Sequence, residues 1–126
     1  MSNDSPTITL VGHCRPDVFA MTAAIRGFLP SANVVSINDE MQMSEPTNLF
    51  LVNRILDGSF SNESGIELIR ELPNGSSPAI LITNIEEHAQ SAIEAGAVPG
   101  FGKANMRSNE ARQALLSALN IERTTE

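Results

Sequence analysis

The stretch Leu49-Phe50-Leu51-Val52-Asn53 sets four consecutive apolar residues directly before an amide and a polar loop. An apolar run without polar alternation is typical of a strand that is buried on both faces of a parallel sheet. In open α/β sheets, the residue just past the carboxyl end of such a strand lies at the binding crevice. The sequence therefore predicts a buried strand that leads to a site, with Asn53 and Arg54 at its edge.

Similar strand-like segments alternate with helical ones along the chain. The predicted strands are residues 7–11, 33–37, 49–52 and 79–83, with a weaker fifth at 97–102. The predicted helices are residues 16–29, a short one around 40–43, 66–72, 84–95 and 108–119. Asn84 and Ser108 are the expected N-caps of the last two, and Gly96 is an expected C-cap. Five strand–helix alternations predict an α/β sandwich with a five-stranded parallel sheet covered on both faces.

Composition limits the function classes that need to be considered. The 126 residues predict one domain, with a core from about residue 7 to 120 and frayed ends outside it. A net charge of −7 and the lack of a basic stripe argue against nucleic-acid binding. The apolar runs are too short to span a membrane. The single cysteine, Cys14, excludes an internal disulfide, and a cytoplasmic location is expected.

The segments AILITN (79–84) and SAIEAGAVPGFGKAN (91–105) carry a family resemblance. With strand ends at Gly12-His13, Asn53, Thr83 and Lys103, nearly the whole chain resembles the receiver domain of bacterial two-component response regulators. The resemblance implies a flavodoxin-like (βα)5 sandwich with strand order 2-1-3-4-5. It also implies a site in which an Asp after the third strand accepts a phosphoryl group. In that family two acids after the first strand hold Mg²⁺, a Thr or Ser ends the fourth strand and a Lys ends the fifth.

The site positions of the family are only partly kept in this chain. Thr83 and Lys103 match, but Gly12 and His13 stand where the acidic pair is expected, and Asn53 replaces the phospho-acceptor. An amide is too weak a nucleophile to attack a phosphoryl donor, and Mg²⁺ needs carboxylates to keep its place in such a site. The sequence therefore predicts a degenerate pseudo-receiver that binds no metal or cofactor and is not an enzyme.

The partly exposed aromatic residue by which family receivers report phosphorylation is also displaced. Gly100 occupies its position, and Phe101 follows one place later. Lys103 is followed by Ala104 instead of the usual proline, and the loop before Gly65 is longer than usual. These differences predict that the phosphorylation switch is lost together with the chemistry.

The other polar residues near the strand ends leave alternatives open. His13 is interpreted as a neutral imidazole bonded to a loop carbonyl, and Cys14 as structural. His13, Arg54 and Lys103 could instead form an anion site, unless Arg54 faces solvent or pairs with Asp57 and Lys103 bonds to Asn53 or a carbonyl. The alternative function is a small flavodoxin-like anion- or ligand-binding protein, or an enzyme, that uses His13, Cys14 or Arg54.

The favoured hypothesis is a protein–protein interaction module of bacterial signal transduction. Its expected partner is a signalling kinase, a regulator or an output domain, and a homodimer is left open. As in family receivers, the docking face would include the fourth helix, the fifth strand and the fifth helix, or else the chain would dock through the rim of the crevice. The residues proposed for it are mostly polar or acidic: Glu86, Gln90, Glu94, Phe101 and Lys103.

Overall fold

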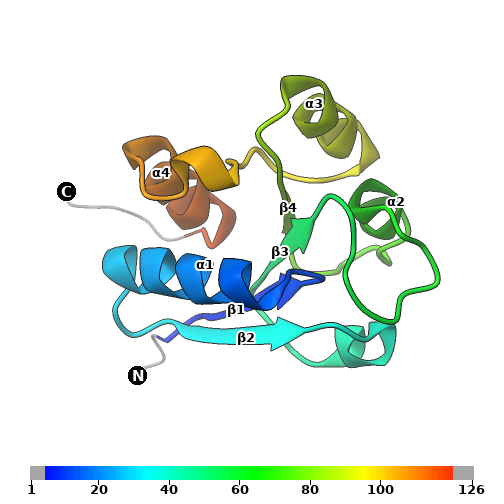
Figure 1. Ribbon diagram of the computed structural model, residues 1–126, viewed down its shortest axis with the longest axis horizontal. Helices are drawn as coiled ribbons and strands as arrows, with labels where there is room; N and C mark the ends of the chain where they lie inside the picture. The colour runs from blue at the N-terminus through cyan, green and yellow to red at the C-terminus, as the bar shows by residue number, and fades with distance from the viewer. Residues whose placement is uncertain (1–4, 121–126) are drawn as a thin grey trace.

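The computed structural model describes residues 5–120 and contains one parallel β-sheet (Figure 1). Its four strands are β1 (Thr7–Val11), β2 (Asn33–Ile37), β3 (Leu49–Asn53) and β4 (Ala79–Ile82), in the order β2-β1-β3-β4. In the centre, β1 pairs with both neighbours, so that Ile8 lies between Val34 and Leu49. The predicted α/β class and the order of these four strands are confirmed.

Four α-helices and two 3-10 helices connect and cover the strands (Figure 1). The α-helices are α1 (Arg15–Phe28), α2 (Gly65–Arg70), α3 (Glu86–Ala95) and α4 (Asn109–Ala118). The 3-10 helices are η1 (Glu40–Ser44) and η2 (Lys103–Asn105). No helix among residues 5–120 has the length and apolar character needed to cross a lipid bilayer.

The sheet separates two hydrophobic clusters, which explains why β3 is apolar throughout. Leu49 and Leu51 pack with α1 and α4 on one face. Phe50 and Val52, which point the other way, pack with α2 and α3. Successive side chains of a strand point to opposite faces, so a strand covered on both faces needs apolar residues at every position.

The predicted fifth strand, residues 97–102, requires correction, because this segment is not a strand in the structure. It runs beside β4 and makes two backbone hydrogen bonds to it, from Val98 N to Ala79 O at 2.9 Å and from Thr83 N to Phe101 O at 3.4 Å. Between them, Pro99 has no N–H to donate, and Gly100 weakens a strand. The edge of β4 is thus covered by an irregular segment.

The start of α3 also differs from the prediction. Ile85, not Asn84, is its N-cap residue, and Ile85 makes no side-chain cap. The Asn84 amide oxygen instead accepts a hydrogen bond from Ala104 N at 2.9 Å, which ties β4 to η2. The two other predicted caps are confirmed: Gly96 ends α3 with φ of 121°, and Ser108 Oγ accepts from Ala111 N.

Candidate functional site

The carboxyl ends of β1, β3 and β4 meet at one edge of the sheet, as the parallel topology requires. They bring Gly12 and His13, Asn53, and Thr83 to this edge, and Lys103 follows at the start of η2. A cavity of about 320 Å³ lies here, next to β3 and β4. It is lined by Asn53, Arg54, Ile55, Ile82, Thr83, Asn84, Ile85 and Lys103, and we call it the β3–β4 cavity.

The side chain of Asn53 is fully engaged in local hydrogen bonds. Its amide nitrogen donates to Gly12 O at 2.9 Å and to Ile55 O at 2.8 Å, and its amide oxygen accepts from Arg54 N at 3.1 Å. Carbonyl oxygens only accept, so the group that faces them must be a donor. An aspartate cannot make either bond and would place its charge against two carbonyl oxygens. The local structure is therefore built around an amide.

Gly12 has a backbone conformation that an acidic residue would adopt only with strain. Its φ is 73°, in the left-handed region that favours glycine. A Cβ at this position would lie 2.7 Å from Leu56 Cδ2 and 3.0 Å from Leu56 Cα. In addition, Gly12 O accepts from Asp57 N at 3.0 Å. The loop after β3 thus packs against Gly12 at the end of β1.

His13 lies below the surface and is only 1% exposed. Its Nε2 lies 2.9 Å from Leu51 O and must carry the proton, because the carbonyl can only accept. The predicted carbonyl bond therefore exists, although it goes to strand β3 and not to a loop. Burial lowers the pKa of His13 to about 4, so the ring is neutral at pH 7. A buried neutral imidazole supplies no positive charge to an anion site.

Lys103 has a partner that the sequence did not suggest. Its Nζ lies 2.5 Å from Asp17 Oδ2 on α1, and neither side chain is more than about a third exposed. The hydrogen bond from Lys103 lowers the pKa of Asp17, which keeps this carboxylate ionised. The expectation that Lys103 bonds to Asn53 or to a carbonyl is corrected by this ion pair.

The other candidate residues are not brought together into a reactive group. Arg54 lines the β3–β4 cavity and makes no ion pair with any residue of 5–120, so pairing with Asp57 is not seen. Cys14 is an exposed free thiol at the N-cap of α1. Within residues 5–120, no three His, Cys, Asp or Glu side chains are placed to hold a metal ion. The donor set of this edge does not fit a Mg²⁺ site.

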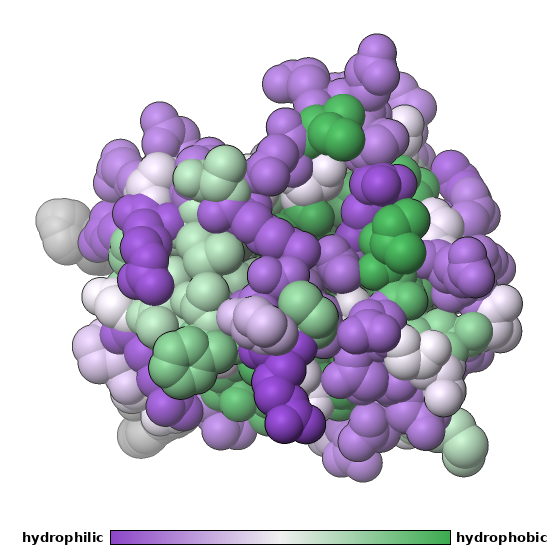
Figure 2. Space-filling model, in the orientation of Figure 1, coloured by the Kyte–Doolittle hydropathy of each residue, from purple (hydrophilic) through white to green (hydrophobic). Residues whose placement is uncertain are grey.

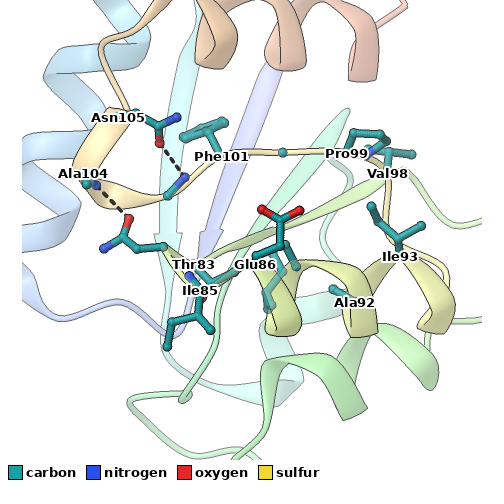
Figure 3. A pocket seen from close by; sticks show the side chains of 15 residues that line it. Thr83, Ile85, Glu86, Ala92, Ile93, Val98, Pro99, Phe101, Ala104 and Asn105 are labelled. Atoms are coloured by element: carbon teal, nitrogen blue, oxygen red, sulfur yellow. Dashed lines mark hydrogen bonds between the residues drawn. The ribbon is translucent and has the colours of Figure 1, made fainter.

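A second cavity, of about 400 Å³, lies between α3 and the segment 97–105 (Figure 3). Glu86 on α3 points its carboxylate toward the segment that contains Pro99 and Phe101 (Figure 3). Glu86, Gln90 and Glu94 are exposed, as the interaction-face prediction requires. Phe101 is a correction, because it is only 7% exposed and packs into the core with α4.

Sequence reasoning missed the apolar part of this face. Ile85 and Ile93 are 46% and 40% exposed, and both line the second cavity. Together with Ala89 they recur every four residues, which is one side of a helix. This spacing can be read from the sequence. Its exposure was not predicted, because an apolar helical stripe is normally assigned to the core.

The fold of the chain is similar to the folds of solved structures, although comparisons of its sequence with family models and curated proteins found no match. No protein-family model and no curated protein matches the chain. A candidate response regulator of Chloroflexus aurantiacus superposes with a TM-score of 0.72 at 14% identity, covering 93% of this chain and 99% of its own. A response regulator of Thermotoga maritima gives 0.70 at 18%, covering 92% and 98%.

The receiver domain of a sensor histidine kinase of Pseudomonas aeruginosa has a TM-score of 0.68 at 20% identity. The match covers 92% of this chain and 98% of that domain, which has a magnesium ion coordinated in its active site cleft. Likeness at such low identity establishes the fold alone. The chain therefore has the fold of response-regulator receiver domains, and its function must be argued from its own site.

Proposed function

We propose that the chain is a receiver-fold signalling module that is neither phosphorylated at residue 53 nor a magnesium binder, and that acts by binding another protein. The observation that carries this proposal is the amide of Asn53, which donates to both Gly12 O and Ile55 O. The position of the phospho-acceptor is thereby used to hold the loop after β3 against the end of β1. A group in this role is not available as a nucleophile.

The surroundings of Asn53 support the same proposal. Gly12, whose positive φ disfavours other residues, and the buried neutral His13 leave no carboxylate where the family keeps two. Mg²⁺ is usually held by one or two carboxylates together with phosphate oxygens, so metal and phosphoryl group would lose their anchors together. Lys103, which is retained, is already neutralised by Asp17.

The test is an amide NMR titration of the ¹⁵N-labelled chain with Mg²⁺, and then with Mg²⁺ plus beryllofluoride or acetyl phosphate. We expect no shifts beyond those that the same ionic strength causes in NaCl. A receiver domain that retains its aspartate is the positive control. Saturable shifts centred on Asn53 and Thr83, or a mass gain of one phosphoryl group on the loop after β3, would contradict the proposal.

The partner surface that we propose is α3 together with the segment 97–105. It presents Glu86, Gln90 and Glu94 to solvent around the apolar Ile85 and Ile93. Interface cores are apolar and their rims charged, and charge complementarity would favour a basic partner, whether a kinase, a regulator or an output domain. The double variant Glu86→Lys, Glu94→Lys should no longer capture this basic partner. The variant Glu63→Lys, in the loop before α2, should still capture it.

A second copy of the chain is the alternative partner for this surface, although its own acidic residues would oppose the contact. Sedimentation at increasing protein concentration tests it directly, with the Glu86→Lys, Glu94→Lys variant as the comparison.

An enzymatic function that uses Cys14 is the competing proposal. The neighbouring histidine, His13, is buried and uses its Nε2 for Leu51 O, while Cys14 is exposed, so no imidazole among residues 5–120 is placed to activate this thiol. Slow labelling of Cys14 at neutral pH is therefore expected, and labelling faster than that of free cysteine would favour the enzyme.

A further inference from the structure

The β3–β4 cavity contains donors that the fold leaves unused. Thr83 Oγ accepts from Ile85 N at 3.1 Å, so its hydroxyl proton remains available for a ligand. The Asn84 amide oxygen accepts a hydrogen bond from Ala104 N, so the NH₂ group of the same amide points away from Ala104. No acceptor within residues 5–120 is bonded to either donor. Both residues line the cavity together with Arg54.

Of the two basic residues that line this cavity, Arg54 is the one that has no ion-pair partner within residues 5–120. Lys103, the other basic residue that lines it, is paired with Asp17 at 2.5 Å. His13 does not line this cavity and is neutral. The guanidinium of Arg54 makes no ion pair with the described residues. Its planar fork of donors matches a carboxylate, which it can bind through two parallel hydrogen bonds.

Two isoleucines give the cavity an apolar wall. Ile55 and Ile85 are 51% and 46% exposed, and both line it. Isoleucine side chains are among those most often buried, so two exposed ones in one cavity indicate a surface that a ligand can cover. On the face shown in Figure 2, hydrophobic residues lie in separate patches among hydrophilic ones, including beside α2 and α3. The volume of about 320 Å³ is at the small end of the range of roughly 300–1,000 Å³ for ligand pockets.

We propose that the β3–β4 cavity binds a monocarboxylate carried on a short branched aliphatic group. Arg54 holds the carboxylate, Thr83 and Asn84 donate to it, and Ile55 and Ile85 cover the aliphatic part. Such a group occurs on free branched-chain acids and at the C-terminus of a polypeptide that ends in leucine or valine. The inference rests on the proposed function, because a phosphorylated site would use the same space.

The charge of the site favours a monoanion over phosphate. One uncompensated guanidinium can neutralise one negative charge, whereas the dianion of phosphate would keep a second one. That second charge would stay uncompensated in a chain of net charge −7, because Lys103, the other cation of the cavity, is already paired with Asp17. Phosphate also offers no apolar surface to Ile55 and Ile85. A branched carboxylate satisfies both parts of the cavity.

The test is an amide and arginine-Nε NMR titration of the full chain with four probes: 4-methylpentanoate, N-acetyl-leucine, N-acetyl-leucinamide and inorganic phosphate. We expect saturable shifts at Asn53–Ile55, Thr83–Ile85 and Lys103 with at least one of the two carboxylates. The neutral amide and phosphate should bind about tenfold more weakly or not at all. Preference for N-acetyl-leucine indicates a chain terminus, and preference for 4-methylpentanoate a free acid.

Variants separate the charged part of the cavity from the apolar part. Arg54→Gln should weaken carboxylate binding about tenfold, while Arg112→Gln, an exposed arginine of α4 that does not line the cavity, should leave it unchanged. Ile55→Ser should weaken the binding of 4-methylpentanoate, because it removes apolar surface that would cover the aliphatic group. Equal binding of the amide and the acid, no effect of Arg54→Gln, or no saturable shift with either carboxylate would overturn the proposal.

The two proposals fail in different ways. If beryllofluoride and Mg²⁺ shift Asn53 and Thr83, the proposed function is wrong and the carboxylate site loses its premise. If neither beryllofluoride nor the carboxylates cause shifts, the pseudo-receiver proposal stands and only the ligand inference is wrong.

Discussion

The two halves of the sheet's carboxyl edge differ in how far their polar groups are already used. On the β1 side, the Asn53 amide nitrogen spans Gly12 O and Ile55 O, and His13 is buried with a bond to Leu51 O. On the β4 side, Thr83 and Asn84 keep free donors, and Arg54 has no ion-pair partner among the described residues. One half, which we call closed, has its polar groups engaged, while the other, which we call open, keeps donors free among the described residues.

This difference indicates that the residues at the exits of β1 and β3 have structural roles of their own. Asn53 Nδ2 and Asp57 N both donate to Gly12 O and so join β1 to the loop after β3. We expect changes on the closed half to affect stability and changes on the open half to affect binding.

The largest effect is expected at Gly65, where α2 begins beside the closed half. A Cβ there would lie 2.0 Å from Asn53 O and 2.9 Å from Val52 Cγ1, so Gly65→Ala should lower the free energy of unfolding by about 3 kcal/mol or more. Urea denaturation followed by far-UV circular dichroism measures it, since the chain has no Trp or Tyr. The matched control is Gly27→Ala within α1, where a Cβ would meet nothing within 4 Å. This substitution should raise the free energy of unfolding by roughly 0.5–1 kcal/mol.

The next effect is the pH dependence caused by His13. Its pKa is about 4 in the folded chain and near 6.5 when unfolded, so the unfolded state binds the extra proton first as pH falls. Stability should be highest above pH 6.5 and should decrease by about 3 kcal/mol from this residue as pH falls to 4. His13→Gln can keep a donor for Leu51 O without titrating. If its stability between pH 7 and 4.5 falls as steeply as that of the unaltered chain, His13 is not the cause.

A moderate effect is expected at Asn53. Asn53→Ala leaves Gly12 O and Ile55 O without this donor and should cost about 1–3 kcal/mol. Asn53→Asp should cost at least as much at pH 7, because its charge faces the same two carbonyl oxygens. It should also fail to bind Mg²⁺ in a calorimetric titration. Tight Mg²⁺ binding by the single variant Asn53→Asp would show that the closed half is not built around the amide.

The smallest effect is expected where the two halves meet, at the pair of Asp17 and Lys103. Both side chains are partly exposed, at 28% and 34%, so solvent screens the pair and Lys103→Met should cost less than about 1 kcal/mol. Because the pKa of Asp17 is lowered, its contribution exists above the unfolded pKa and is lost as pH falls through the folded value. Asp17→Asn should remove this acid-range component, and a pKa of Asp17 unchanged by Lys103→Met in carboxyl-carbon NMR would contradict the pairing.

Hydrophobic pattern alone was enough for most of the fold. The uninterrupted apolar run of β3 required a sheet that is covered on both faces, and the two clusters above and below it confirm that requirement. The pattern did not distinguish a strand from an irregular segment at residues 97–102. Strand formation there depends on backbone N–H donors, and Pro99 has none. The apolar pattern of the neighbouring side chains does not show whether these backbone hydrogen bonds can form.

The site was predicted less completely than the fold. The residues at the strand ends were identified, because parallel topology brings them together. Their partners were not, since the ion pair between Lys103 and Asp17 joins residues 86 positions apart. Asn84 is of a residue type that favours helix N-caps, but its amide oxygen accepts a hydrogen bond from Ala104 N instead. Phe101 follows the position of an exposed aromatic, yet it is buried beneath α4.

The sequence by itself determined the α/β class, the order in which strands and helices follow one another, and the absence of a carboxylate at the strand-three exit. These properties depend on residue type and local spacing, which the chain carries in one dimension. Only the tertiary structure decided that Asn53 is held by two carbonyl groups, that His13 is buried and neutral, and that Arg54 has no ion-pair partner among residues 5–120. Such properties depend on which atoms from distant segments come within a few ångströms of one another.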